Sequence, residues 1–489
     1  MTCQLPSDCL NEIFEYLEAD KLTLHSCLLV NRLWCEISVR ILWKNIWNFK
    51  SSFQQHDTLR IESSIISTLF ACLPDESKEL LHKNKIFIST PTSKQPLFNY
   101  AAFFRALSIC EINRMVDNAF KDKPLISPLS LKDRNYLVMN EMIKMFASQI
   151  YSLKKLSYRY YYNINFSFPY FPGVKDLSEL YCSSNLPSSF FHQLSKVCHN
   201  IQTLSIDFQD HDASNELKEM ISLQNNLKNL TLSTFDVSWE NIIPALKNHS
   251  NITKLYLYGN FDNLPFSFVS LFPNLQEFIF SFLGGEDFEN FRTLQYVNFS
   301  KLQTLKIPYQ CPKPEYIIKF LENNGKNLKK FHISESDKAF NLSIAKFCPN
   351  LKNLSAIFNN GESDVLKTIF INCQQLESIK IWCGEGLLTE KEIFEIVANY
   401  SPNNFCELKI FNESYTGISS EDLECFFISW KNRIPKKLLT LINIKDDYTY
   451  DLDDFEENRK IIEKYENLGI IKFRTIEYEE EEKGEFYYY

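Results

Sequence analysis

The sequence has few glycines and none of the short motifs that usually hold a cofactor or a reacting group. Eleven glycines in 489 residues lie far below the average usage of about 7 %. No GxGxxG or P-loop spacing occurs, so no phosphate-binding loop is indicated. The eight histidines form no HExxH motif, and no GxSxG motif is present. We therefore expect a protein that is not an enzyme and that needs no cofactor.

Long apolar runs and closely spaced cysteines are also missing. No run of 18 apolar residues occurs, so no membrane span is expected, and no basic segment followed by an apolar one suggests a secretory signal. The 14 cysteines form no CxxC pair, which favours free thiols in the cytosol or the nucleus. Cys198-His199 and the pair Cys373 and Cys383 suggest a metal site, but their spacing does not fit tetrahedral ligands. We expect structural thiols and no metal.

The net charge of −9 is confined to the end of the chain. Residues 446–489 contain 15 acidic and 6 basic residues, 15 − 6 = 9 net negative charges, so residues 1–445 sum to zero. A neutral body lacks the basic stripe of a nucleic-acid-binding protein, and no nucleic-acid partner is expected. The run Glu479–Glu482 is typical of a solvated tail.

One pattern, apolar-x-x-apolar-x-apolar, recurs eleven times through the body of the chain. Successive copies start 23 to 29 residues apart, which is the period of leucine-rich repeats. A degenerate twelfth copy starts near Leu438 or Leu439. The copies start at Leu153, Leu177, Ile201, Leu227, Ile252, Leu275, Leu302, Leu328, Leu351, Leu376 and Phe405.

The repeat pattern predicts an α/β fold. Its three apolar positions point into a core, and the residues between them face outward. The intervening segments carry helical patterns, as in residues 188–198, 215–223, 315–322 and 388–398. Each unit buries its apolar face only against its neighbours, so the stack forms one continuous core. We expect a right-handed leucine-rich-repeat solenoid over residues 146–445, with one short parallel strand and a helical return in each repeat.

The first 47 residues predict three short amphipathic helices. Leu5-Pro6 begins the first helix, and Leu10, Ile13, Phe14 and Leu17 share one face of it. So few residues cannot bury all of their large apolar side chains, and an exposed remainder usually marks a partner surface. An ordinary helical bundle packed against the rest of the chain is the alternative.

This segment resembles an F-box, the helical module that docks onto a Skp-family adaptor in cullin–RING ubiquitin ligases. The resemblance is carried by Leu5-Pro6, Ile13-Phe14, the spacing of Val30 and Trp34, and Leu42-Trp43. The repeats, with phrases such as Cys348-Pro-Asn-Leu, are similar to the cysteine-containing repeats that follow many F-boxes. The resemblance implies that a set of residues forms the adaptor-binding surface or the core beneath it, without separating the two roles: Leu5, Pro6, Leu10, Ile13, Leu17, Val30 and Trp34.

Four parts of the chain follow from these patterns. Residues 1–49 form the segment that resembles an F-box, and residues 146–445 are expected to form the solenoid. Between them, residues 50–145 are expected to form a mostly helical connector and cap, with helices over 61–73, 103–120 and 133–150. Residues 446–489 are expected to hold a final helix over 455–468 and the acidic tail.

The resemblance implies a non-catalytic subunit that recognises a protein substrate for ubiquitination. Ubiquitin transfer itself then belongs to other subunits, and this chain supplies proximity and orientation. The alternative is a repeat scaffold that acts outside any ligase. Aromatic and cationic side chains at outward strand positions suit a protein surface, although several could instead pack against one another along the sheet. The candidate substrate-binding residues are Tyr256, Tyr258, Ile279, Lys306, His332, Lys380 and Trp382.

Overall fold

The computed structural model describes residues 5–47, 55–87, 96–121, 129–159, 168–209, 213–260, 264–284, 288–335, 337–412, 417–445 and 452–477. The chain forms two compact units. The first contains Met1–Asn229 and Pro244–Asn248, and the second contains Leu230–Ile243 and His249–Tyr489. The expected tail residues 478–489 lie outside the described residues.

Three helices form the N-terminal module, as the sequence predicts: α1 (Ser7–Glu15), α2 (Lys21–Cys27) and α3 (Arg32–Leu42). The Asp20 side chain caps α2 by accepting from the Thr23 amide at 3.0 Å, and the Asn31 side chain caps α3 by accepting from the Trp34 amide at 2.9 Å. Each cap satisfies an amide that lacks a partner within its helix. Short polar caps therefore fix where both helices begin.

The connector is largely helical, but the predicted helix over 103–120 is wrong at its start. A 3-10 turn, η2 (Tyr100–Phe103), is followed by a short strand, β1 (Ala106–Ser108), and only then by helix α6 (Ile109–Phe120). The strand forms because Ala106 to Ser108 pair in register with Lys155 to Ser157 of the next strand, a contact that local periodicity does not encode. The other connector helices are α4 (Gln55–Ala71), α5 (Asp75–Lys83) and α7 (Leu131–Gln149).

Repeats follow in the first unit, each with a short strand and a helical or 3-10 return. The elements are β2 (Lys155–Tyr158), η3 (Pro172–Asp176), β3 (Glu179–Ser183), α8 (Ser188–Val197), β4 (Thr203–Phe208), α9 (Asn215–Ser222) and β5 (Asn229–Thr234), of which only Asn229 belongs to this unit.

The second unit continues the same pattern. Its first returns contain short elements: η4 (Glu240–Ile242), α10 (Ile243–Leu246), η5 (Ser267–Leu271) and η6 (Glu289–Leu294). The last three residues of α10, Pro244 to Leu246, belong to the first unit. Its later returns are α11 (Pro314–Asn324), η7 (Gly325–Asn327), α12 (Lys338–Phe347), α13 (Ser363–Asn372), α14 (Glu390–Tyr400), α15 (Ser420–Lys431) and α16 (Glu456–Asn467). Its strands are β6 (Lys254–Gly259), β7 (Glu277–Phe282), β8 (Thr304–Ile307), β9 (Lys330–Ile333), β10 (Asn353–Ile357), β11 (Ser378–Cys383), β12 (Glu407–Asn412), β13 (Leu439–Lys445) and β14 (Ile471–Glu477).

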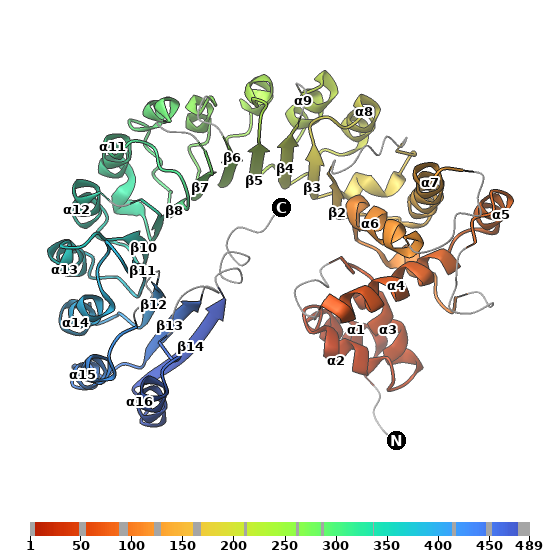
Figure 1. Cartoon of the computed structure of the whole chain (residues 1–489). Helices are drawn as coiled ribbons and strands as arrows, with labels where there is room; N and C mark the ends of the chain where they lie inside the picture. Colours follow the sequence, from red (N-terminus) through yellow and green to blue (C-terminus); the bar gives the residue numbers. More distant parts are fainter. Residues whose placement is uncertain are drawn as a thin grey trace. The chain divides into compact units, whose positions relative to one another are not determined.

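The strands form one 14-stranded sheet in which the order β1 to β14 follows the chain. Each described pairing of neighbouring strands is parallel. In the second unit, helices α11 to α16 line one side of the strands (Figure 1). Parallel strands joined by helical returns form the leucine-rich-repeat arrangement, and the predicted α/β solenoid is confirmed.

Backbone hydrogen bonds join successive repeats at one repeated position. The carbonyl of the residue before a strand accepts two amides from the next repeat: the Lys154 carbonyl accepts from Ser178 and Glu179, both at 2.9 Å. Each repeat thus supplies the acceptor for the next, as expected of a stack that is stabilised only by nearest neighbours. The sheet also continues past the expected end of the solenoid, because β14 pairs with β13 along its whole length.

Candidate protein-binding surfaces

The N-terminal module buries a small closed core. Leu10, Phe14, Leu24, Ile37 and Ile41 are all buried in it. The rings of Phe14 and Trp34 meet edge to face with centroids 5.0 Å apart, and Leu17 packs against the same cluster. Of the predicted adaptor-binding residues, Leu10, Leu17 and Trp34 therefore hold the helices together.

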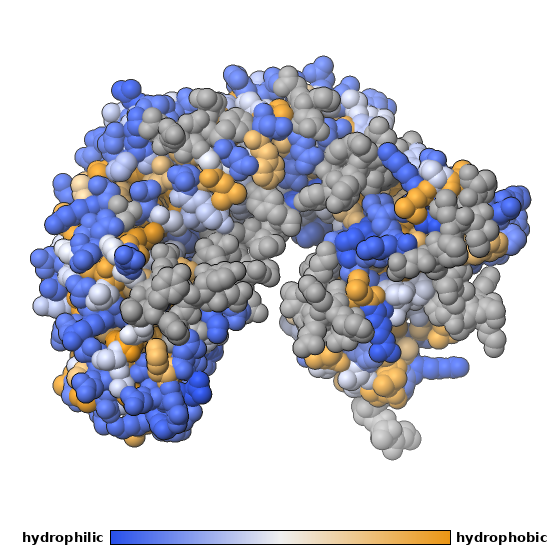
Figure 2. All heavy atoms as spheres, viewed as in Figure 1, coloured by the Kyte–Doolittle hydropathy of each residue, from blue (hydrophilic) through white to orange (hydrophobic). Residues whose placement is uncertain are grey.

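Large apolar side chains remain on the surface of this module. Ile13 is 48 % exposed and Tyr16 is 90 % exposed, although both belong to the segment that builds the core. Pro6 is also exposed. Hydrophobic atoms are visible among the surface atoms of the module (Figure 2). We call the following residues the exposed apolar set: Leu5, Ile13, Tyr16, Leu22, Leu29 and Val30.

Sequence reasoning named Leu5, Ile13 and Val30 as adaptor-binding candidates but not the other three members of this set. Helical spacing is the sequence signal that could have identified Tyr16 among these three residues. Tyr16 follows Ile13 by three residues, so the two share one face of the first helix. Leu29 follows Leu22 by seven residues, but α2 ends at Cys27, before Leu29. The pattern alone does not decide which face is buried, because both faces of a short helix can be apolar.

The end of the module is hydrogen-bonded to the first strand of the sheet. The Lys44 carbonyl accepts from the amides of Arg105 at 2.9 Å and Ala106 at 3.0 Å. The Trp47 indole Nε1 donates to the Ala106 carbonyl at 2.8 Å. The Trp43 ring packs on Phe104, with centroids 5.9 Å apart. The module is therefore joined to the repeats of the first unit by direct contacts.

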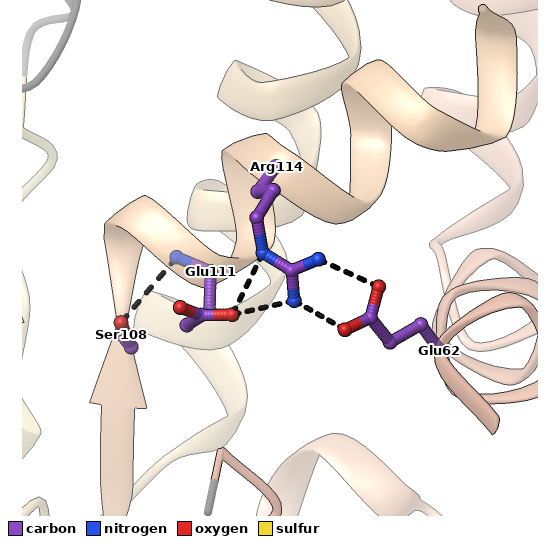
Figure 3. A network of polar contacts seen from close by, with 4 residues as sticks. All are labelled: Glu62, Ser108, Glu111 and Arg114. Atoms are coloured by element: carbon purple, nitrogen blue, oxygen red, sulfur yellow. Dashed lines mark hydrogen bonds and ion pairs between the residues drawn. The ribbon is translucent and has the colours of Figure 1, made fainter. Parts of the chain in front are cut away.

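An ion-pair network joins two connector helices. Arg114 on α6 donates from Nη1 to Glu62 of α4 at 2.7 Å, and from Nε to Glu111 at 3.0 Å (Figure 3). Ser108, the last residue of β1, caps α6 by accepting from the Glu111 amide. Burial opposes the charge of Arg114, but the hydrogen bonds to Glu62 and Glu111 raise its pKa overall. The network holds α6 in place against α4.

A row of polar side chains crosses the strands of the second unit, at positions between the core residues. Register places Lys306, His332, Ser355, Lys380 and Lys409 side by side on strands β8 to β12. We call these five residues the cationic row. Neighbouring strands are about 4.8 Å apart, so the row spans about 19 Å.

The cationic row lines a depression of about 360 Å³. Lys330, Glu277 and Glu407 also line it. The two carboxylates already have partners: Lys254 lies 3.1 Å from Glu277, and Ser378 Oγ donates to Glu407 at 2.7 Å. The side chains that converge here carry a net positive charge.

The structure brings several predicted substrate-binding residues together. Tyr256 and Ile279 continue the cationic row onto β6 and β7, next to Lys306. The Lys380 Nζ lies 4.8 Å from the centre of the Trp382 ring, and the His332 and Trp382 rings are 6.0 Å apart. Tyr258 lies two positions farther along β6 than Tyr256.

The expectation that these side chains are exposed is wrong for most of them. Tyr258, Ile279, His332, Lys380 and Trp382 are all buried. Side chains on adjacent strands cover one another: Trp382 packs with Phe411, Ile442 and Ile444 from β12 and β13. The alternative in which several of them pack along the sheet is therefore observed. Their role in substrate binding stays a prediction.

The cysteines at the strand entrances are buried. Burial raises the pKa of Cys198 and of Cys373 to about 12. The Cys373 Sγ donates to the Cys348 carbonyl at 3.3 Å. Thiols in this state are poor metal ligands and poor nucleophiles. Among the described residues, no three His, Cys, Asp or Glu side chains are placed to hold a metal ion.

Comparison with known families decides the nature of the N-terminal module. Residues 2–48 match the family described as F-box-like. This module is an F-box-like domain. Its match covers the three helices and the whole exposed apolar set, and it ends at the contact between Trp47 and Ala106.

The similar solved structures are remote in sequence. One is a leucine-rich-repeat protein, LegL7 of Legionella pneumophila, with 16 % identity, a TM-score of 0.37, and coverage of 56 % of this chain and 90 % of that one. Another comes from a crystal structure of the Rad7 and Elc1 complex in yeast, with 13 % identity, a TM-score of 0.36, and coverage of 92 % and 95 %. A leucine-rich-repeat protein of Leptospira interrogans has 16 % identity, a TM-score of 0.28, and coverage of 68 % and 92 %. A search of curated proteins found no match.

No helix among the described residues is long and apolar enough to cross a membrane.

Proposed function

We propose that this chain is the substrate-recognition subunit of a Skp–cullin–F-box type E3 ubiquitin ligase. In this role the F-box-like domain docks onto a Skp-family adaptor, and the solenoid binds a protein substrate. The chain itself does no chemistry. It holds the substrate close to the ubiquitin-transferring subunits, which is a contribution of proximity and orientation.

The exposed apolar set is the observation that carries the proposal. The core of the domain is already closed by Leu10, Phe14, Leu24, Ile37 and Ile41, so the set is not a remainder of an unfinished core. Burying a large apolar side chain is worth about 1.5–3 kcal/mol. Several such side chains on one small domain are typical of a protein-binding surface.

The junction between the F-box-like domain and the repeats supports the same role. Lys44, Trp47 and Ala106 connect the domain to the first strand by hydrogen bonds. A receptor acts by orientation only when its two binding parts are held firmly. The junction meets this requirement for the repeats of the first unit.

The free thiols favour a reducing compartment, and we infer a cytosolic or nuclear location. The alternative function is a repeat scaffold that works outside any ligase. The two functions differ in whether the exposed apolar set is needed, so one binding experiment separates them.

The experiment is co-expression with a Skp-family adaptor and affinity capture, followed by size-exclusion chromatography. Two variants, Ile13→Asp and Val30→Asp, place a charge on exposed positions of the domain and leave its core intact. Ile371, which is 56 % exposed on α13, provides the matched control Ile371→Asp.

We expect a stoichiometric complex for the natural chain and for Ile371→Asp. Each F-box-like domain variant is expected to weaken the complex at least about 30-fold, which corresponds to about 2 kcal/mol at a binding hot spot. A folded, soluble natural chain that forms no complex would contradict the proposal and favour the scaffold.

A further inference from the structure

We propose that the cationic row is the binding site for a short, extended, acidic segment of a protein partner. The inference rests on the proposed receptor role and names the chemical class of segment that the receptor recognises. Lysines, a histidine and a serine from five different repeats meet there, so no single repeat encodes the site.

The charges of the row favour an anionic ligand. Lys306, Lys380 and Lys409 lie in the row, and Lys330 lies beside it in the same depression. Glu277 and Glu407 line the same depression, so its four lysines exceed its two carboxylates by two charges. A surplus of positive side chains in one depression raises the local positive potential, which attracts an anionic segment.

Ser355 provides an independent observation. It is 8 % exposed, it stands at the centre of the row, and it lines the depression. Its Oγ is buried and has no hydrogen-bond partner among the described residues. A buried hydroxyl without a partner is energetically unfavourable. An acceptor oxygen from a bound carboxylate or phosphate would satisfy it.

The dimensions of the row fit a short peptide. Four strand spacings of about 4.8 Å give about 19 Å between Lys306 and Lys409. An extended chain rises about 3.3 Å per residue, so about six residues cover the row. Lys380 and Lys409 are direct register neighbours and form the densest pair of charges.

The aromatic ring next to the row suits the same ligand. Trp382 lies two residues after Lys380 on β11, with the Lys380 ammonium 4.8 Å from its ring centre. The ring restricts the lysine side chain, which lowers the entropy that binding must overcome. His332 is held near the same ring, 6.0 Å away.

The test measures binding of a fluorescein-labelled hexaglutamate peptide to the full-length chain by fluorescence anisotropy, with hexaglutamine as the neutral probe. The double variant Lys380→Gln/Lys409→Gln removes the densest pair of charges. Lys326→Gln/Lys346→Gln removes two exposed lysines outside the depression and matches the change in net charge.

We expect hexaglutamate to bind and hexaglutamine not to bind. The row variant is expected to weaken binding at least tenfold and the control variant less than twofold. Raising the salt concentration is expected to weaken binding by the natural chain, because the contacts are ionic. Adaptor capture is expected to be unchanged in both double variants, so a failure here is distinct from a failure of the ligase role.

Two outcomes would overturn the proposal. One is that hexaglutamate does not bind to the full-length chain, or that both double variants lose affinity for it equally. The other concerns the chain's own run Glu479–Glu482, which has the same chemistry as the probe. If the full chain does not bind the probe while a chain ending at Glu477 binds it, the occupant is this run rather than a partner.

Discussion

The backbone carbonyl of Lys44 accepts the amide of Ala106 at 3.0 Å, in the same way that each repeat accepts the amide of the next one. The Arg105 carbonyl repeats this contact with Lys154 and Lys155. The last residues of the F-box-like domain therefore occupy the place of a repeat at the start of the stack. The domain is part of the repeat architecture of the first unit rather than a separate body on a linker.

This junction predicts a local change in hydrogen exchange. Trp47→Phe removes the indole donor to the Ala106 carbonyl but retains most of the apolar ring. One hydrogen bond contributes about 1 kcal/mol, so the amides of Arg105 and Ala106 are expected to exchange about fivefold faster. The amides of Ser178 and Glu179 lie two strands away and serve as the control. Unchanged exchange at Ala106 would show that Trp47 does not hold the junction.

Adaptor docking predicts protection of Cys9. This exposed cysteine lies on α1, four residues before Ile13, and so shares a helix face with it. In a Cys3→Ser chain bound to a Skp-family adaptor, we expect Cys9 to react with N-ethylmaleimide at least tenfold more slowly than in the free chain. Cys406 and Cys425 are exposed on the solenoid and are expected to keep their rates. Mass spectrometry of the labelled peptides measures all three.

The connector network predicts a large effect from a single charge removal. Glu62 is 5 % exposed and relies on Arg114 for compensation. Arg114→Met leaves a buried carboxylate without its cation and is expected to lower the free energy of unfolding by about 3 kcal/mol. The double variant Glu62→Leu/Arg114→Met is expected to recover most of this loss, since an apolar pair can replace a buried ion pair.

Denaturant unfolding followed by circular dichroism measures this difference. Lys460→Met is the control, because Lys460 and Glu456 form an exposed ion pair, and such pairs contribute about 0–1 kcal/mol. The double variant could instead lose as much free energy of unfolding as Arg114→Met. The network would then stabilise the protein by packing rather than by charge compensation.

Glu390 predicts a pH-dependent stability. Burial raises the pKa of Glu390 from 4.5 to about 7, and its carboxylate accepts from Asn412 Nδ2 at 3.3 Å. Between these two values the folded state keeps a proton that the unfolded state releases. Stability contributed by this group is therefore lost as the pH rises from about 4.5 to 7, by up to about 3 kcal/mol.

Glu390→Gln is expected to remove this dependence and to stabilise the protein at pH 8 relative to the natural chain. Thermal unfolding at pH 5.5 and pH 8 measures the effect. Glu395→Gln, an exposed position on the same helix, is the control and is expected to leave the pH dependence intact. Equal pH dependence in the natural chain and Glu390→Gln would contradict the assignment.

The strand-entrance cysteines predict slow thiol chemistry. Because burial raises the pKa of Cys198 and Cys373 to about 12, little thiolate forms at neutral pH. We expect their alkylation by iodoacetamide to be at least about 100-fold slower in the native protein than in guanidinium. The exposed Cys406 should differ much less. Fast native labelling of Cys373 would indicate that the repeat opens readily.

Much of the fold could be predicted because its signal is local and repeated. The apolar pattern from Leu302 to Ile307, for example, places β8 correctly, and the degenerate copy near Leu439 corresponds to β13. The ends of the sheet were missed. β1 has only three residues, and β14 lies in a segment with a strong acidic bias, so both strands are specified by pairing with a neighbour rather than by their own pattern.

The candidate sites also combine residues that the sequence pattern indicates with residues that only the structure identifies. The residue pattern alone indicates that Ile13 and Val30 belong to an F-box-like segment and that Lys306, His332 and Lys380 face outward between core positions. Packing in three dimensions is needed to show that Leu10 and Trp34 build the core while Tyr16 and Leu29 stay exposed. The tertiary structure also shows that Ser355 and Lys409 stand beside Lys380. The physical reason is that periodicity fixes the direction of a side chain within its own repeat, whereas its neighbours and its burial depend on strand register and on packing between distant segments.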